Sequence, residues 1–329
     1  MANHIFHLVM KNFKFLIYFI FLAGALFLAS CNDDTIIDGG GIEQNSILQT
    51  ASATDNLSLF VDAINQTGLE NIFSLSGPFT VLAPTNEAFQ ALIDSNPAWN
   101  SLSDIDNSML SNILLFHVLG VQLTSTDFVD SFITTGATGP NNEQISLQID
   151  VSGGIRFNGS ATLVTTDIEA SNGILHIIDE VMLLPSLEDI LLNNAGFSLL
   201  VSAFTRDDLA MDFLSLLSSA EPFTVFAPTD AAFQELIDAN LDWDSLADIP
   251  LDILEPALSY HILEEENVQS DQLFEGQSIV TIGLDTFNID LSYGPVINTT
   301  SGQNVDIILP NIQGVNGVVH AIDAVLLPE

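Results

Sequence analysis

Positive charge is nearly absent from this chain of 329 residues. Its four basic side chains are Lys11, Lys14, Arg156 and Arg206, and they stand against 43 acidic ones. Proteins that bind nucleic acids neutralise phosphates with lysine and arginine, so this balance excludes nucleic acid as a partner. An electrostatic attraction to anionic lipid surfaces is excluded for the same reason.

The excess of carboxylates has two interpretations. It either holds divalent cations or keeps the protein soluble in a saline medium, where charges are screened within roughly 8 to 10 Å. The acidic residues are scattered along the chain and not clustered, which favours the second interpretation.

Cysteine occurs once, at Cys31, so the chain forms no internal disulfide. Two lysines precede an apolar run from Phe15 to Ala29, which is shorter than the roughly 18 to 20 residues of a membrane-spanning helix. This pattern is typical of a signal peptide. The sequence Leu-Ala-Ser-Cys at 28–31 resembles a bacterial lipobox, which implies that Cys31 is lipidated and becomes the new N-terminus. The alternative is an inert thiol in an apolar helix.

Motifs for catalysis are also missing. The chain has no Gly-x-Ser-x-Gly elbow, no His-Glu-x-x-His motif and no glycine-rich phosphate loop. Carboxylate pairs for a glycosidase are available only by chance. His261 and Glu264 place two ligands on one helix face, whereas a metal site needs three or four. We therefore expect no enzyme, no metal site and no cofactor.

An internal duplication dominates the remaining sequence. The segment Pro78–Phe89 returns as Pro222–Phe233, an offset of 144 residues. The same offset relates further pairs: Trp99 and Trp243, His117 and His261, and Asn172-Gly173 and Asn316-Gly317. Each copy of about 140 residues is far longer than a solenoid repeat, so the copies are predicted to be complete domains.

These patterns predict four segments. Residues 1–30 form a lipoprotein signal peptide, and residues 31–45 form a flexible tether that contains Gly39, Gly40 and Gly41. Residues 46–185 form the first domain and residues 186–329 the second, with the boundary near Pro185. Cleavage before Cys31 leaves two basic against 43 acidic side chains, a formal charge of −41.

Periodicity predicts the main elements of each copy. An apolar stripe with helical spacing is formed by Leu57, Phe60, Val61 and Ile64. The run 79–82 reads as a short strand closed by Pro84, and the helix after it contains Phe89, Leu92 and Ile93 and is capped by Thr85 or Asn86.

Later segments of each copy are also predictable. A helix is expected over Met109 to His117, and its counterpart ends at His261 with a start shortened or kinked by Pro256. Asn172-Gly173 and Asn316-Gly317 predict hairpin turns, and the closing strands are expected at 174–184 and 318–327. Helices and strands in this arrangement indicate an α+β fold.

Two segments carry a resemblance to a known family. Residues 77–89 and 172–179 resemble the two signature boxes of the fasciclin domain, and the second copy repeats both. The resemblance covers roughly residues 46–329. It implies two tandem domains, each a twisted β-sandwich or wedge flanked by helices, of a kind found in extracellular adhesion proteins.

The resemblance also implies candidate ligand contacts. In animal relatives, integrin binding involves an Asp-Ile pair before the second box and a Tyr-His pair in the preceding helix. This chain has Asp167 and Ile168 in the first copy and Tyr260 and His261 in the second, with His117 after a phenylalanine in the first copy. The second copy has Asn311-Ile312 in place of the acidic pair. Because a bacterium has no integrins, these residues are candidates for another ligand.

The two histidines have a second interpretation. His117 and His261 follow the apolar stripes of their helices, which favours buried histidines with hydrogen-bond partners.

Two functions are consistent with these features. The first is a cell-surface lipoprotein, anchored in the outer membrane by lipid alone, that mediates adhesion or matrix and biofilm contacts with a polymer, protein or glycan. The acidic residues after Cys31 resemble export tags that lead to the cell surface. The alternative is a lipoprotein that captures a glycan or small ligand for uptake. An apolar cavity of roughly 300 Å³ or more with convergent polar groups would favour capture.

Overall fold

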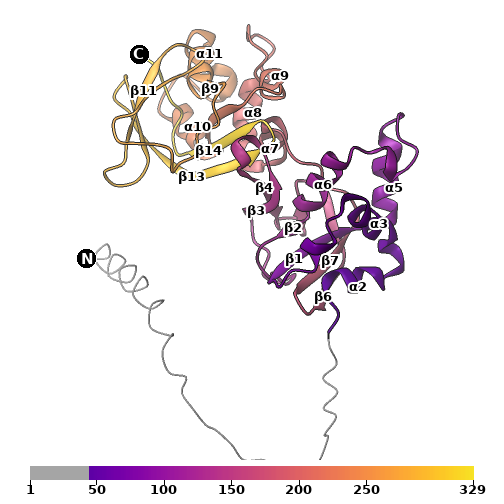
Figure 1. The fold of residues 1–329 in the computed structure, drawn as a ribbon. Coiled ribbons are helices and arrows are strands. Elements are labelled where there is room, and N and C mark those ends of the chain that lie inside the picture. The colour runs from indigo at the N-terminus through magenta and orange to yellow at the C-terminus, as the bar shows by residue number, and fades with distance from the viewer. Residues whose placement is uncertain (1–43) are drawn as a thin grey trace, which may run out of the picture. The chain divides into compact units, whose positions relative to one another are not determined.

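The computed structural model describes residues 44–329 (Figure 1). The predicted signal peptide, Cys31 and nearly all of the tether lie outside the described residues, so lipidation remains a prediction. Residues 44–329 cluster as one unit and contain separate hydrophobic cores for both halves. A segment that holds its complete cores is expected to fold by itself.

The first half of the described chain combines short helices with seven strands. Its helices and strands are α2 (Ile47–Ser52), α3 (Ser58–Thr67), α4 (Glu70–Phe73), β1 (Phe79–Pro84), α5 (Asn86–Ser95), α6 (Asn107–Phe116), β2 (Val118–Leu119), β3 (Ser131–Thr138), β4 (Gln144–Asp150), β5 (Arg156–Phe157), β6 (Ala161–Ala170) and β7 (Gly173–Ile178). The strands pair in order and close into a barrel.

The second half repeats this order. Its helices and strands are α7 (Leu187–Asn193), α8 (Ser198–Phe204), α9 (Phe213–Leu217), β8 (Phe223–Pro228), α10 (Asp230–Asp238), α11 (Leu251–Tyr260), β9 (Ile262–Glu264), β10 (Ser278–Val280), β11 (Thr286–Asp290), β12 (Val296–Thr299), β13 (Asn304–Gly314) and β14 (Gly317–Ile322). The sheet has the order β10-β11-β12-β13-β14-β8-β9. The α+β class predicted for both copies is confirmed.

Strand β1 is buried on both faces. Val81 and Ala83 pack into the core formed with the helices, whereas Leu82 faces the barrel interior with Phe116 and Phe157. Successive strand residues point to opposite faces, so a strand covered on both sides reads as an unbroken apolar run. β1 pairs in parallel with β7 and antiparallel with β2. β8 has the same two relations to β14 and β9.

The predicted helices follow their apolar stripes. Phe60 and Ile64 are buried on α3, which ends at Gly68 in the left-handed conformation. Thr85 is the cap of α5, and its hydroxyl accepts a hydrogen bond from the amide of Ala88 at 3.1 Å. The predicted cap is therefore confirmed.

Two expectations about the later elements were wrong in detail. The closing strands end at Ile178 and Ile322, because β6 pairs with β7 only as far as Leu163 opposite Ile178. Helix α11 is not shortened, because Pro256 lies on its exposed face, where water can solvate the carbonyl that loses its partner. The alternative, a start kinked by Pro256, stays a prediction. Helix α6 contains Met109, as expected, and 41% of this residue is exposed.

The two halves meet through polar groups of β4. The Ser146 hydroxyl accepts a hydrogen bond from the amide of Gln313 at 3.0 Å. The Gln148 side chain donates to the Asn193 carbonyl at 3.2 Å. Phe132 of β3 packs against the core of the second half. Aromatic and buried polar side chains of the first half therefore contact the second half.

Candidate functional site

Asp167 lies in a bulge of β6. Its φ is +61°, and the register of β6 with β7 shifts between Thr165 and Ile168. The carboxylate accepts hydrogen bonds from the Ser125 amide at 2.7 Å and from the Ser125 hydroxyl at 2.6 Å. The Ser125 hydroxyl is the main reason that the pKa of Asp167 is lowered. The exposed carboxylate thus holds the loop that contains Ser125.

The second half builds the same bulge with an amide. Asn311 has a φ of +64°, accepts from the Ser270 amide at 2.8 Å and donates to the Ser270 hydroxyl at 2.9 Å. Aspartate and asparagine both tolerate this left-handed conformation. The change from Asp167 to Asn311 therefore removes a charge but keeps the contact with the loop.

A buried histidine supports each bulge. The Nδ1 atom of His176 accepts a hydrogen bond from the Asp167 amide. Its Nε2 atom donates a hydrogen bond to the Leu123 carbonyl at 2.9 Å. His320 makes the equivalent pair of bonds with Asn311 and Val268. Burial lowers the pKa of His320 to about 4, so its ring is neutral at pH 7.

His117 and His261 lie at the ends of α6 and α11. His117 donates from Nδ1 to the Ile113 carbonyl at 2.7 Å, and its Nε2 accepts from the Met182 amide at 3.1 Å. His261 makes the same bonds with Ala257 and Leu326. Both side chains are completely buried, and burial lowers the pKa of each to about 4. They are core histidines, as their place on the apolar stripe predicted.

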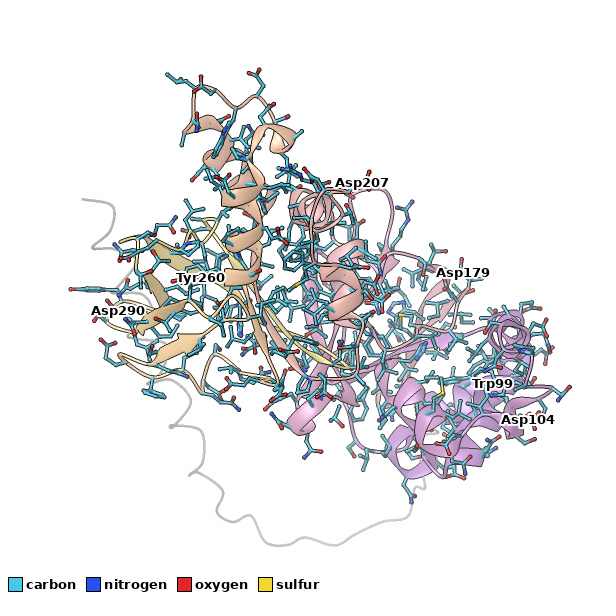
Figure 2. All side chains as sticks on the ribbon, turned by 90° about the horizontal axis from the view of Figure 1, so that it is seen from above. Trp99, Asp104, Asp179, Asp207, Tyr260 and Asp290 are labelled. Atoms are coloured by element: carbon cyan, nitrogen blue, oxygen red, sulfur yellow. The ribbon has the colours of Figure 1, made fainter. Side chains whose placement is uncertain are left out.

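The candidate residues do not form one surface. On β6, Asp167 is exposed and Ile168 is partly buried. Tyr260 and His261 are buried in the second half. Figure 2 shows the position of Tyr260. The Tyr260 hydroxyl donates to the Thr286 carbonyl at 2.6 Å. Ligand contact by Tyr260, His261 or His117 remains a prediction, and it would require the segments that cover these side chains to move away.

The asparagine of each second box, Asn172 or Asn316, stabilises the fold through side-chain hydrogen bonds. Asn172 is buried; its Oδ1 accepts from the Ile47 amide at 2.8 Å, and its Nδ2 donates to the carbonyls of Phe73 and Leu75 at 3.0 and 2.9 Å. One side chain therefore ties α2, α4 and the chain after α4 to the β6–β7 turn. Asn316 makes the equivalent three bonds in the second half.

We expect Asn172→Ala to lower the free energy of unfolding by about 3 kcal/mol, because it leaves three backbone groups without partners. Urea unfolding followed by circular dichroism measures the change. Asn96→Ala is the control, since Asn96 makes one exposed bond to Ala98. An equal loss in both variants would contradict the assigned role.

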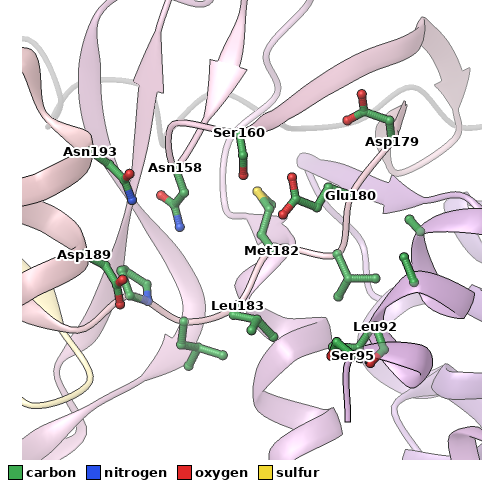
Figure 3. Close-up of a pocket in the computed structure, with 15 residues that line it drawn as sticks. Leu92, Ser95, Asn158, Ser160, Asp179, Glu180, Met182, Leu183, Asp189 and Asn193 are labelled. Carbon is green, nitrogen blue, oxygen red and sulfur yellow. Dashed lines mark hydrogen bonds between the residues drawn. The ribbon is translucent and has the colours of Figure 1, made fainter. Parts of the chain in front are cut away.

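A groove lies beside the segment that joins the two halves (Figure 3). Its volume is about 440 Å³. The residues that line it come from α5, the β5–β6 turn, the segment after β7 and α7: Ala88, Ala91, Leu92, Ser95, Asn158, Ser160, Asp179, Glu180, Val181, Met182, Leu183, Leu184, Pro185, Asp189 and Asn193. We call it the linker groove.

The linker groove was not predicted from the sequence. Its asparagines, Asn158 and Asn193, are 35 residues apart and lie outside both signature boxes. The family signature ends at Asp179, and the residues after it were predicted only as a strand. No pattern in the sequence indicates that α7 lies opposite α5 across this segment.

The carboxylates are widely distributed. Figure 2 shows Asp104, Asp179, Asp207 and Asp290 at separate places on both halves. Within residues 44–329, no group of three or more histidine, cysteine, aspartate or glutamate residues is arranged to hold a metal ion. No helix in this part of the chain is long and apolar enough to span a bilayer.

The sequence and the fold both match known proteins. The family model of the fasciclin domain matches residues 55–185 and 195–328. Protein sll1483 of Synechocystis sp. is 31% identical over 140 residues, which cover 43% of this chain and 74% of that protein. Human periostin is 28% identical over 264 residues, which cover 77% of this chain but only 29% of periostin.

A solved structure has the same fold. A FAS1 domain pair from the insect cell adhesion molecule fasciclin I is similar with a TM-score of 0.50 and 21% sequence identity, over 82% of this chain and 95% of that one. The family match extends over most of the sequence and contains both signature boxes twice. The chain therefore belongs to the fasciclin family and carries two fasciclin domains in tandem.

Proposed function

We propose that this protein is a lipoprotein of the outer membrane, exposed at the cell surface, that mediates adhesion or matrix and biofilm contacts without catalysing a reaction. The observation that carries the proposal is the tandem pair of fasciclin domains, an arrangement shared with a domain pair of an insect cell adhesion molecule. Its partner is a matrix polymer or a protein or glycan of another cell. The lipobox at 28–31 supports attachment to the membrane through the lipid alone.

Two linked domains favour adhesion for a physical reason. A second contact made by the same molecule benefits from a high effective concentration, which raises the overall affinity by roughly 100-fold or more. The Ser146 and Gln148 side chains form hydrogen bonds with the second domain.

Attachment of cells to a matrix-coated surface under flow tests the proposal. We expect deletion of the gene to reduce attachment, and the full chain to restore it. A chain that lacks residues 186–329 should restore no more than about a tenth of it, because only one contact remains. Cys31→Ser is the control for anchoring: it should leave the protein in the medium and the cells unattached. Full attachment with a single domain would contradict the role of avidity.

Capture of a small ligand is the second candidate. It is supported by the linker groove, whose 440 Å³ exceed the roughly 300 Å³ of a small-ligand site. A glycan array probed with residues 44–329, with calcium and with chelator, separates the two functions. Saturable binding of one defined sugar would favour capture, whereas broad binding that needs both domains would favour adhesion.

A further inference from the structure

We propose that the linker groove binds an extended polypeptide segment in which basic side chains alternate with apolar ones. The inference deepens the proposed binding function by naming the chemistry of a partner, and it rests on that function. Four features of the groove support it: an apolar floor, an acidic rim, amide groups, and a free stretch of main chain.

The floor of the groove is apolar. Leu92, Val181 and Met182 are almost completely buried along it, and Leu183 is 51% exposed. Figure 3 shows Met182 and Leu183 between the side chains of α5 and those of α7. An apolar side chain that covers Leu183 would remove apolar surface from water at roughly 25 cal/mol per Å².

The rim of the groove has only negative charge. It contains Asp179, Glu180 and Asp189, and no lysine, arginine or histidine lines it. Asp179 accepts from the amide and hydroxyl of Thr162 at 2.7 and 2.6 Å, and Asp189 is held in the same way by Ser186. These two carboxylates are therefore fixed before a ligand arrives, which lowers the entropic cost of binding a cation.

Glu180 is the carboxylate available for a new contact. It is exposed and makes no side-chain hydrogen bond within residues 44–329. A lysine or arginine beside it would form an exposed ion pair worth about 0.2 to 1 kcal/mol. Charge complementarity of this kind selects basic partners and rejects acidic ones.

The main chain of the groove is free to pair. Leu183 and Leu184 belong to no strand, and their amides make no hydrogen bond within the described part of the chain. The main chain of an extended peptide can accept hydrogen bonds from these two amides, and alternate side chains of such a peptide point to the same side. Asn158 supplies a further donor, because only its Oδ1 is used, by the Gln148 amide at 3.0 Å.

A peptide that matches this chemistry tests the inference. The probe is a fluorescein-labelled decapeptide of alternating lysine and leucine, whose binding to residues 44–329 is measured by fluorescence anisotropy in 150 mM NaCl. Two companion peptides replace every lysine by glutamate or every leucine by serine. We expect saturable binding of the lysine-leucine peptide, at least 10-fold weaker binding of the lysine-serine peptide, and no binding of the glutamate-leucine peptide.

Matched variants place the contact in the groove. Glu180→Gln should weaken binding about 3- to 5-fold, in keeping with an exposed ion pair. Glu87→Gln makes the same charge change on the exposed face of α5, outside the groove, and should change binding less than 2-fold. Leu183→Ser should weaken binding about 5-fold, whereas Leu241→Ser, at a fully exposed position elsewhere, should have no effect.

Three results would overturn the inference, and the first is the absence of saturable binding by the lysine-leucine peptide. Equal effects of Glu180→Gln and Glu87→Gln would mean that the whole acidic surface attracts the peptide. Equal binding of the lysine-serine and lysine-leucine peptides would mean that the apolar floor is not used. The attachment assay fails or succeeds independently, so a loss of adhesion in the deletion strain with no peptide binding would leave adhesion standing and remove the peptide partner.

Discussion

Gly173→Ala is expected to destabilise the first domain by about 4 kcal/mol or more, which is a large part of the stability of a typical domain. Gly173 begins β7 with a φ of +154°, and a Cβ there would lie 2.0 Å from the Phe79 carbonyl oxygen and 2.8 Å from the Phe79 nitrogen. The obstacle is main chain, which cannot rotate away as a side chain can. The parallel pair of β1 and β7 would have to separate, with loss of its hydrogen bonds at about 1 kcal/mol each and added backbone strain.

Gly68→Ala is the matched control for this effect. Gly68 also has a positive φ, +69°, but no atom lies within 4 Å of the position of a Cβ. Its replacement should cost only about 1 kcal/mol, the conformational penalty alone. Urea unfolding of both variants measures the difference, and Gly317→Ala should repeat the large loss in the second domain, where the Phe223 oxygen lies 2.0 Å away. Similar losses of stability in the Gly68 and Gly173 variants would contradict this prediction, because they would show that β1 moves to accommodate the added Cβ.

Acid is expected to destabilise both domains as their buried histidines take up protons on unfolding. The pKa of His117, in the first domain, and of His261 and His320, in the second, is lowered to about 4 by burial, from 6.5 in the unfolded chain. Protons therefore bind the unfolded state more tightly. The stability contributed by the neutral rings is complete above pH 6.5, falls as the pH drops from 6.5 towards 4, and changes no further below that.

The size of the effect follows from proton linkage. Each of these three histidines costs on the order of 2 kcal/mol at pH 5. Each domain contains one of the two tryptophans, Trp99 or Trp243, packed against its own core. Fluorescence of the variants Trp243→Phe and Trp99→Phe therefore reports the domains separately during urea unfolding at pH 7 and pH 5. Stability that stays constant to pH 4 and then falls in both domains would assign acid unfolding to the carboxylates instead.

The elements that were predicted correctly depend on neighbours in the sequence. Thr85 caps α5 because its hydroxyl reaches an amide three residues away, and Phe60 and Ile64 face the core because they are one helical turn apart. His117 could be read as buried for the same reason. Such contacts are fixed by spacing alone.

The Asn-Gly pairs depend on contacts between residues far apart in the sequence. The sequence predicted a hairpin turn, but in the structure the turn is formed by Ser171 and Asn172, and Gly173 already pairs with Ala170 in the β6–β7 ladder. Glycine is needed there because β1, more than 90 residues earlier, lies against it. Asn172 likewise accepts a hydrogen bond from the amide of Ile47, which is 125 residues away.

By itself, the sequence determined that the chain is duplicated, acidic and α+β, and which side chains cap helices or point into cores, because these follow from composition, internal similarity and local periodicity. The tertiary structure alone decided that Asp167 holds Ser125, that Tyr260 is covered, and that α5 and α7 enclose the linker groove. The physical reason is that burial and hydrogen-bond partners of polar groups depend on segments that meet only after the chain has folded.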